Sequence, residues 1–183
     1  ELGIKPAGVC CLTSEAGMQT AALLREYYDL KGLRKIDTDK FIYKNYQREI
    51  WDRSNVEGPR WFTASTSEDV IDLINTIKLP AIIKPVDSAG SRGISKITET
   101  NHKTLQNLFN FAHENSRTGQ VIVEEFMEGT EYTAEVLAYN GTINVLALTS
   151  KKKVADTDDT VANELATPDI PDDQIKLIEA TTI

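Results

Sequence analysis

The sequence lacks two features that would each point to a particular class of protein. It contains no apolar run close to the roughly 20 residues of a membrane-spanning helix, and no basic-then-apolar segment opens it as in a secretory signal. Positive charge is in short supply, with 20 lysine and arginine residues against 28 aspartate and glutamate residues and a net charge of −8. Nucleic acids and anionic membrane surfaces repel an acidic protein, so we expect neither as a partner.

Cysteine is scarce as well. The chain has two cysteines, the adjacent Cys10 and Cys11, in an apolar stretch that we expect to form a short buried strand over residues 8–13. Neighbouring side chains on a strand point in opposite directions, which disfavours a disulfide between them. Unpaired cysteines are typical of a reducing compartment, so the sequence predicts a cytoplasmic protein.

The pattern of apolar residues predicts a mixture of helices and strands in a chain of 183 residues, long enough for one domain or two small lobes. Helices are expected over residues 15–28 with a stop at Gly32, over 39–51, after a Thr66–Asp69 capping box, over 101–115 and over 172–183. Strands are expected within residues 57–63 and over 81–85, 94–97, 120–126, 131–139 and 142–150, and a loop over 155–171. Ser14 and Thr38 are expected to cap the first two helices. Because the last strands form a hairpin around Asn140-Gly141, the predicted fold class is α+β.

One lysine, Lys84, stands inside the apolar strand "AIIKP" at residues 81–85. An unpaired ammonium group in a half-buried strand is costly, so we expect an anion to meet it. The alternative is a lysine that snorkels to water at the end of the strand.

The loop after Lys84 is built from small residues and hydrogen-bond donors. Its residues of this kind are Ser88, Ala89, Gly90, Ser91, Arg92 and Gly93. Such a loop can turn several backbone N–H groups toward one anion. It differs from the common phosphate loops because the lysine precedes the glycines and a strand, not a helix, follows. The sequence therefore predicts a strand–loop–strand flap over phosphates, with a plain hairpin turn as the alternative.

A second segment, "VIVEEFMEGTEYTAEV" at residues 121–136, suits the other end of a nucleotide. Phe126 and Met127 offer an apolar wall for a base. Glu128 and Glu131 are acceptors for ribose hydroxyls. A solvated acidic turn is the alternative for this segment by itself.

Taken together, "IIKPVDSAGSRGI" and "VIVEEFMEGTEYTAEV" resemble the ATP-grasp superfamily, which includes biotin carboxylase, carbamoyl-phosphate synthetase and glycinamide ribonucleotide synthetase. Upstream, "AALLREYYDLKGL", "TDKFIYKNY" and "GPRWF" resemble the passage into the ATP-grasp lobes, so the similarity covers about residues 13–138. It implies the end of an N-terminal domain over residues 1–37, a small lobe with the flap over 38–120, and the start of a second lobe over 121–183.

The resemblance also implies a role for each matching position. Lys40 matches the first basic residue that contacts ATP, Lys84 the strand lysine that reaches the α and β phosphates, and Ser88–Gly93 the flap above them. Glu131 matches a residue that binds the ribose. The hinge that reads adenine, largely through its backbone, is matched by Glu124, Glu125, Phe126 and Met127.

The implied activity is ATP-dependent activation of a small-molecule carboxylate as an acyl phosphate, which an amine or another nucleophile then attacks, with magnesium as a cofactor. The family's magnesium ligands have no counterpart here, because the one Glu-x-Asn, Glu99–Asn101, directly follows the flap strand and is expected to cap a helix. We therefore expect the magnesium ligands beyond residue 183, in a longer ligase of which this piece alone is inactive. The alternatives are a non-catalytic nucleotide-sensing module and a protein-interaction domain. The sequence leaves open the two substrates, the oligomeric state and the role of Lys151–Lys153.

Overall fold

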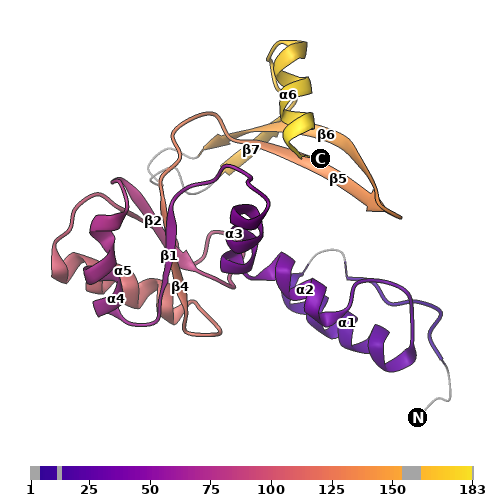
Figure 1. Ribbon diagram of the computed structural model, residues 1–183, viewed down its shortest axis with the longest axis horizontal. Coiled ribbons are helices and arrows are strands. Elements are labelled where there is room, and N and C mark those ends of the chain that lie inside the picture. The colour runs from indigo at the N-terminus through magenta and orange to yellow at the C-terminus, as the bar shows by residue number, and fades with distance from the viewer. Residues whose placement is uncertain (1–4, 12–13, 154–161, 183) are drawn as a thin grey trace. The chain divides into compact units, whose positions relative to one another are not determined.

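The computed structural model describes residues 5–11, 14–153 and 162–182 (Figure 1). These residues form two compact units that divide between Phe126 and Met127. Strand β4, at residues 121–125, belongs to the sheet of the first unit. The three-part division of the chain that the resemblance implies stays a prediction.

The first unit combines helices with one antiparallel sheet. Its helices are α1 (Glu15–Tyr28), α2 (Lys35–Ile42), α3 (Lys44–Arg53), α4 (Ser67–Leu73) and α5 (His102–Glu114), with a 3₁₀ turn η1 (Ile74–Thr76). Its strands are β1 (Trp61–Ala64), β2 (Ala81–Pro85), β3 (Ser95–Ile97) and β4 (Val121–Glu125), in the order β1-β4-β2-β3. The second unit holds a sheet β5-β6-β7 and α6, with β5 (Tyr132–Tyr139), β6 (Thr142–Lys153), β7 (Ala162–Ala166) and α6 (Asp172–Thr182). This architecture confirms the predicted α+β class.

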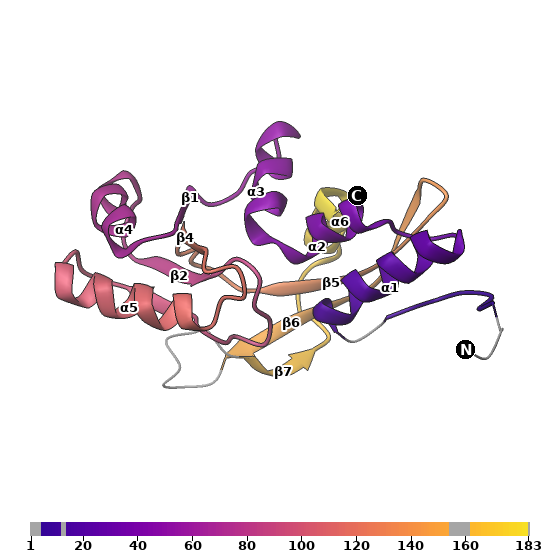
Figure 2. The same ribbon diagram turned by 90° about the horizontal axis from the view of Figure 1, so that it is seen from below.

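The side chains of β2 and β4 alternate between two faces of the first sheet. One face packs against α4 and α5, which lie on the same side of the sheet (Figures 1 and 2). The buried core on this face consists of Ala64, Val70, Ile74, Ile77, Ala81, Ile83, Ile97, Leu105, Phe109, Ala112, Val121 and Val123. Burying each of the larger side chains stabilises the fold by roughly 1.5–3 kcal/mol. The opposite face carries Lys84 and Glu124. Packing of the core on the first face therefore holds the two strands that carry these charged side chains.

Three helix starts follow the sequence closely. The hydroxyl of Ser14 accepts from the backbone N–H of Gly17. Thr66 and Asp69 form the predicted reciprocal capping box. Asn101 accepts from two backbone N–H groups in the first turn of α5, which confirms Glu99–Asn101 as a helix cap.

The segment predicted as a buried strand over residues 8–13 differs from that prediction. Residues 8–11 form no strand and Cys10 is exposed, while residues 12 and 13 lie outside the described residues. A strand needs a hydrogen-bonded neighbour, and no strand in the described part of the chain pairs with residues 8–11. The helix predicted over residues 15–28 is confirmed as α1, but its left-handed cap is Asp29, with φ 53°, and not Gly32.

The helix predicted over residues 39–51 is two helices that break at Tyr43, whose backbone is extended. The backbone N–H of Lys44 donates to the carbonyl of Val86, at 2.9 Å, just after β2. Thr38, predicted as a cap, lies buried inside α2 and donates its hydroxyl to the carbonyl of Arg34. The break is therefore set by a contact with a distant strand, and it starts α3 beside the loop that follows β2.

The hairpin predicted around Asn140-Gly141 is confirmed. Both turn residues have positive φ, 49° and 77°, as a two-residue hairpin turn requires. The loop predicted over residues 155–171 was wrong in part, because Ala162–Ala166 form β7 against the end of β6. Residues 154–161 lie outside the described residues.

Candidate functional site

Lys84 and Glu124 form an ion pair on neighbouring strands of the first sheet. The Nζ atom of Lys84 lies 2.5 Å from Glu124 Oε2, and Arg48 Nε on α3 lies 2.7 Å from Glu124 Oε1. The side chains are 17%, 5% and 12% exposed for Lys84, Glu124 and Arg48. An anion does meet Lys84, as the strand pattern predicted, but among the described residues that anion is Glu124.

The electrostatic balance keeps Glu124 ionised. Burial alone would raise the pKa of Glu124, but the charges of Lys84 and Arg48 outweigh it and hold the pKa below its ordinary value. One carboxylate thus serves two cations, which leaves positive charge in excess at this point of the sheet.

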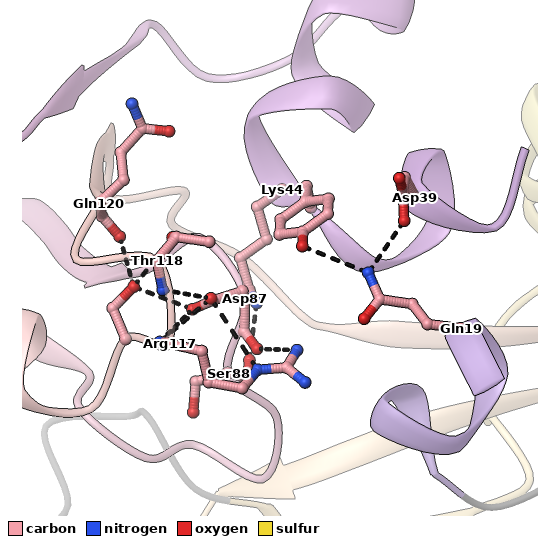
Figure 3. Close-up of polar contacts among 10 residues, drawn as sticks. Gln19, Asp39, Lys44, Asp87, Ser88, Arg117, Thr118 and Gln120 are labelled. Atoms are coloured by element: carbon pink, nitrogen blue, oxygen red, sulfur yellow. Dashed lines mark hydrogen bonds and ion pairs between the residues drawn. The ribbon is translucent and has the colours of Figure 1, made fainter. Parts of the chain in front are cut away.

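Lys44, at the start of α3, adds a third cation. Its Nζ donates to the carbonyl of Ser88, at 2.7 Å, in the loop after β2 (Figure 3). Burial lowers the pKa of Lys44, the nearby Glu15 carboxylate opposes that shift, and the Lys84 ammonium adds to it. We call Lys44, Arg48, Lys84 and Glu124 the cation cluster.

The loop over residues 87–93 joins β2 to β3, which are antiparallel neighbours, so the predicted strand–loop–strand arrangement is present. Gly90, Ser91 and Gly93 all have positive φ, which lets the chain turn tightly. Residues 90–92 are exposed and Asp87 is buried. That this loop covers phosphates stays a prediction.

A cavity of about 720 Å³ opens beside this loop. Its lining comes from the start of α1, the loop and the end of α5: Cys11, Ser14, Glu15, Ala16, Met18, Asp87, Ser88, Ala89, Arg92, Glu114, Asn115 and Arg117. One carboxylate oxygen of Glu15 is buried and has no hydrogen-bond partner among the described residues. The Nε of Arg92 donates to the carbonyl of Ala89. The cavity thus offers charges of both signs to a ligand.

The hinge residues predicted to surround adenine lie at the end of β4 and just beyond it. The Glu125 carboxylate accepts from the backbone N–H groups of Arg60 and Lys78, at 3.2 and 3.4 Å. The ring of Phe126 lies under the Lys96 ammonium, 4.0 Å from the ring centroid. The predicted roles of these residues in reading adenine stay predictions.

Two further predicted positions belong to the second unit. Met127 is 66% exposed. Glu131 pairs with Lys151, with 2.5 Å between Oε1 and Nζ. Lys151, whose role the sequence left open, therefore pairs with the carboxylate of Glu131, the residue directly before β5. The ribose-binding role of Glu131 stays a prediction.

Lys40 does not join the cation cluster. It is exposed on α2 and pairs with Asp37, at 2.9 Å. The residues that do join it are Lys44 and Arg48, which were not among the predicted site residues. Their spacing of four places them on one face of a helix, and this spacing is the signal that could have identified them. The ATP contact predicted for Lys40 stays a prediction.

Two further features of the described residues bear on other kinds of site. No group of three histidine, cysteine, aspartate or glutamate side chains in this part of the chain is arranged to hold a metal ion. Separately, none of the described helices is long and apolar enough to cross a membrane.

Comparison with known proteins identifies the family. Residues 42–164, more than half of the chain, match the phosphoribosylglycinamide synthetase ATP-grasp (A) domain. The D-alanine–D-alanine ligase of Aquifex aeolicus is 32% identical over 116 residues, which are 63% of this chain and 38% of that ligase. The chain is a member of the ATP-grasp family, as its sequence motifs predicted.

Solved structures agree on the fold. The crystal structure of an L-amino acid ligase from Bacillus licheniformis has a TM-score of 0.74 at 20% identity, covering 96% of this chain and 40% of its own. Biotin carboxylase from Campylobacter jejuni has a TM-score of 0.76 at 15% identity, covering 95% of this chain and 40% of its own. The chain therefore spans less than half the length of each of these relatives.

Proposed function

We propose that the first unit holds the phosphates of ATP at the cation cluster, as part of a ligase that activates a carboxylate as an acyl phosphate. One observation carries the proposal: Lys84 and Arg48 share the single carboxylate of Glu124, and a third partly buried cation, Lys44, donates to the carbonyl of Ser88 in the donor-rich loop. A polyphosphate would balance the excess charge, and lysine is a common phosphate ligand. Membership in the ATP-grasp family supports the same assignment.

In the proposed reaction a substrate carboxylate oxygen attacks the γ-phosphorus of ATP, the bond to the bridging oxygen breaks, and ADP leaves. An amine then attacks the acyl carbon, inorganic phosphate leaves, and the amine loses a proton to solvent or to a base. Lys44 and Lys84 would stabilise the charge that develops on the leaving ADP. Magnesium, when bound, would neutralise phosphate oxygens. The described residues offer it no ligand cluster, and we propose that its ligands lie beyond residue 183.

We propose that the substrate carboxylate binds in the cavity beside the loop, where Arg92 and Arg117 supply positive charge, and that Glu15 accepts from an ammonium group of the substrate. Ser88 lines this cavity and also accepts from Lys44, so the cavity adjoins the cation cluster. The names of two relatives, a D-alanine–D-alanine ligase and an L-amino acid ligase, support an amino acid as the substrate.

The test is release of ADP by the full-length protein with single amino acids, bicarbonate or phosphoribosylamine as substrate. We expect release with at least one of them, and an amino acid should be the best. Arg92→Ala should raise KM for the carboxylate about tenfold, and more than it raises KM for ATP. ATP binding without release of ADP for any substrate would favour the nucleotide-sensing alternative.

The affinity for ATP should depend on the protonation of Lys44. Its pKa is lowered from 10.5 in the fold, mainly by burial. The ammonium is therefore lost at a lower pH than for an exposed lysine, and ATP affinity should fall as pH rises through that lowered pKa. Calorimetry over the alkaline range measures this, and binding should take up protons there.

Lys44→Met should bind ATP more weakly and should show a flatter dependence of affinity on pH. Lys103→Met is the matched control, because Lys103 is an exposed lysine of α5 and does not belong to the cluster. An unchanged slope in Lys44→Met would assign the titration to another group.

A further inference from the structure

Asp87, the first residue of the loop over 87–93, is fastened to the connection between α5 and β4. It is 3% exposed. Its carboxylate accepts from Ser116 Oγ at 3.0 Å, from the backbone N–H of Arg117 at 3.1 Å and from the backbone N–H of Thr118 at 2.9 Å (Figure 3). The Arg117 guanidinium donates back to the carbonyl of Asp87, at 2.9 Å. This end of the loop is therefore held by main chain and side chains together.

The other end of the loop is held by the same connection. Gly93 is buried with φ +72°, and a Cβ atom there would lie 2.6 Å from Asn115 Cβ and 2.9 Å from Pro85 Cγ. No larger side chain fits without a shift of these neighbours. Residues 115–118, which we call the anchor segment, thus contact both ends of the loop.

Between these ends, the loop reaches toward the cation cluster. Ser88, next to Asp87, accepts from Lys44 through its carbonyl, and Lys84 lies three residues before Asp87. Residues 90–92 are exposed and make the tight turn of the loop. A shift of Asp87 would therefore move Ser88 and the donors after it relative to Lys44 and Lys84.

Asp87 places a carboxylate at the start of a loop that is proposed to bind phosphates. If this carboxylate pointed toward the phosphates, it would repel them. Here three donors and a guanidinium from the anchor segment engage it. Its charge is thereby offset, and its oxygens are directed to the anchor segment. A carboxylate accepts several such donors at once, which a neutral side chain does less well.

We propose that Asp87 is a positioning residue for the nucleotide: bound to the anchor segment, it sets where the backbone donors of residues 88–92 meet the phosphates. This role rests on the proposed function, and Asp87 acts through the loop rather than by touching ATP. Ser116 supports the same positioning role, because its hydroxyl donates a hydrogen bond to the Asp87 carboxylate.

The experiment uses the full-length protein and reads the loop by trypsin, which cleaves after Arg92, an exposed residue of the loop. In Asp87→Asn and Ser116→Ala, cleavage at Arg92 without nucleotide should become several-fold faster. KM for ATP should rise about three- to tenfold, while kcat at saturating ATP changes less than about threefold. ATP should protect Arg92 in the native protein, and the variants should need proportionally more ATP for the same protection.

Asp69→Asn is the matched control. Asp69 also accepts from two backbone N–H groups, those of Ser65 and Thr66, but it caps α4 away from the loop. This control should lose stability yet keep the native KM for ATP and the native cleavage rate at Arg92. If Asp87→Asn fails to fold, Ser116→Ala still tests the positioning role. It removes one hydroxyl donor but keeps the Asp87 carboxylate and its backbone donors.

Two outcomes separate the inference from the proposed function. If Asp87→Asn and Ser116→Ala leave KM for ATP and cleavage at Arg92 unchanged, the positioning role is overturned and Asp87 only stabilises the fold. If the native protein shows no ATP protection and no ATP binding, the proposed function fails, and so does the role toward ATP. Faster cleavage in the variants would then still show that Asp87 anchors the loop.

Discussion

Replacing Lys84 with alanine should reduce the affinity for ATP about a hundredfold, the largest effect on binding that we expect from one substitution. The loss of a charge-assisted bond to phosphate accounts for about 1.5–3 kcal/mol. A second contribution follows from the structure, because Glu124 would keep only Arg48 as its partner and would face the phosphates with less of its charge offset. Calorimetry with a non-hydrolysable ATP analogue on the full-length protein measures the change.

Two further lysine variants make this result specific. Lys44→Ala should also weaken binding, about tenfold or more, because it removes the second ammonium of the cluster. The ATP affinity of Lys40→Ala, compared with that of Lys44→Ala, shows which lysine contributes more: Lys40, which the family resemblance implies, or Lys44, which lies in the cluster. Native affinity in Lys84→Ala would remove the cation cluster from the account of ATP binding.

Replacing Glu124 with alanine should destabilise the fold by about 3 kcal/mol, the largest effect on stability that we expect from a charged residue. Removal of one partner from a buried ionic network leaves the others without compensation. Here Lys84 and Arg48, 17% and 12% exposed, would be left as neighbouring like charges. Urea unfolding measures the change as a lower midpoint with a similar slope.

The same residue should contribute to acid unfolding. The pKa of Glu124 is lowered in the fold from 4.5, so the fold binds this proton less readily than the unfolded chain does. Its contribution to stability is therefore present above pH 4.5 and is lost as pH falls through the lowered pKa. In Glu124→Gln, the free energy of unfolding should therefore fall less between neutral and acidic pH than it does in the native protein.

Glu125→Gln is the matched control for Glu124→Gln, because the two residues are adjacent on β4 and receive the same substitution. Glu125 accepts from two backbone N–H groups at the protein surface and pairs with no cation among the described residues. Its substitution should cost no more than about 1 kcal/mol. Equal losses in the two variants would contradict a special role for the buried ionic network.

Local chemistry explains which elements could be predicted. The capping box at Thr66 and Asp69 and the cap at Asn101 lie within a few residues of the N–H groups that they bind. The turn at Asn140-Gly141 needs only two residues that tolerate positive φ. The alternation in β2 predicted both the buried strand and the unusual position of Lys84.

Long-range contacts explain which features could not be predicted from the sequence. Strand β7 has little intrinsic strand character and exists because it pairs with the end of β6. The break at Tyr43 depends on a bond between Lys44 and Val86, far apart in the chain. The partner of Lys84 could not be named, because Glu124 reaches it only through the register of two strands forty residues apart.

The sequence by itself determined the α+β class, the caps at Ser14, Thr66 and Asn101, the hairpin, the lysine-bearing strand with the loop that follows it, and membership in the ATP-grasp family. These follow from short-range hydrogen bonding, residue periodicity and motif order. Only the tertiary structure decided that Glu124 balances Lys84, that Lys44 and Arg48 complete the cluster, and that Asp87 ties the loop to residues 115–118. Each of these depends on which distant segments pack together, and burial there makes the charge of one side chain control its neighbours.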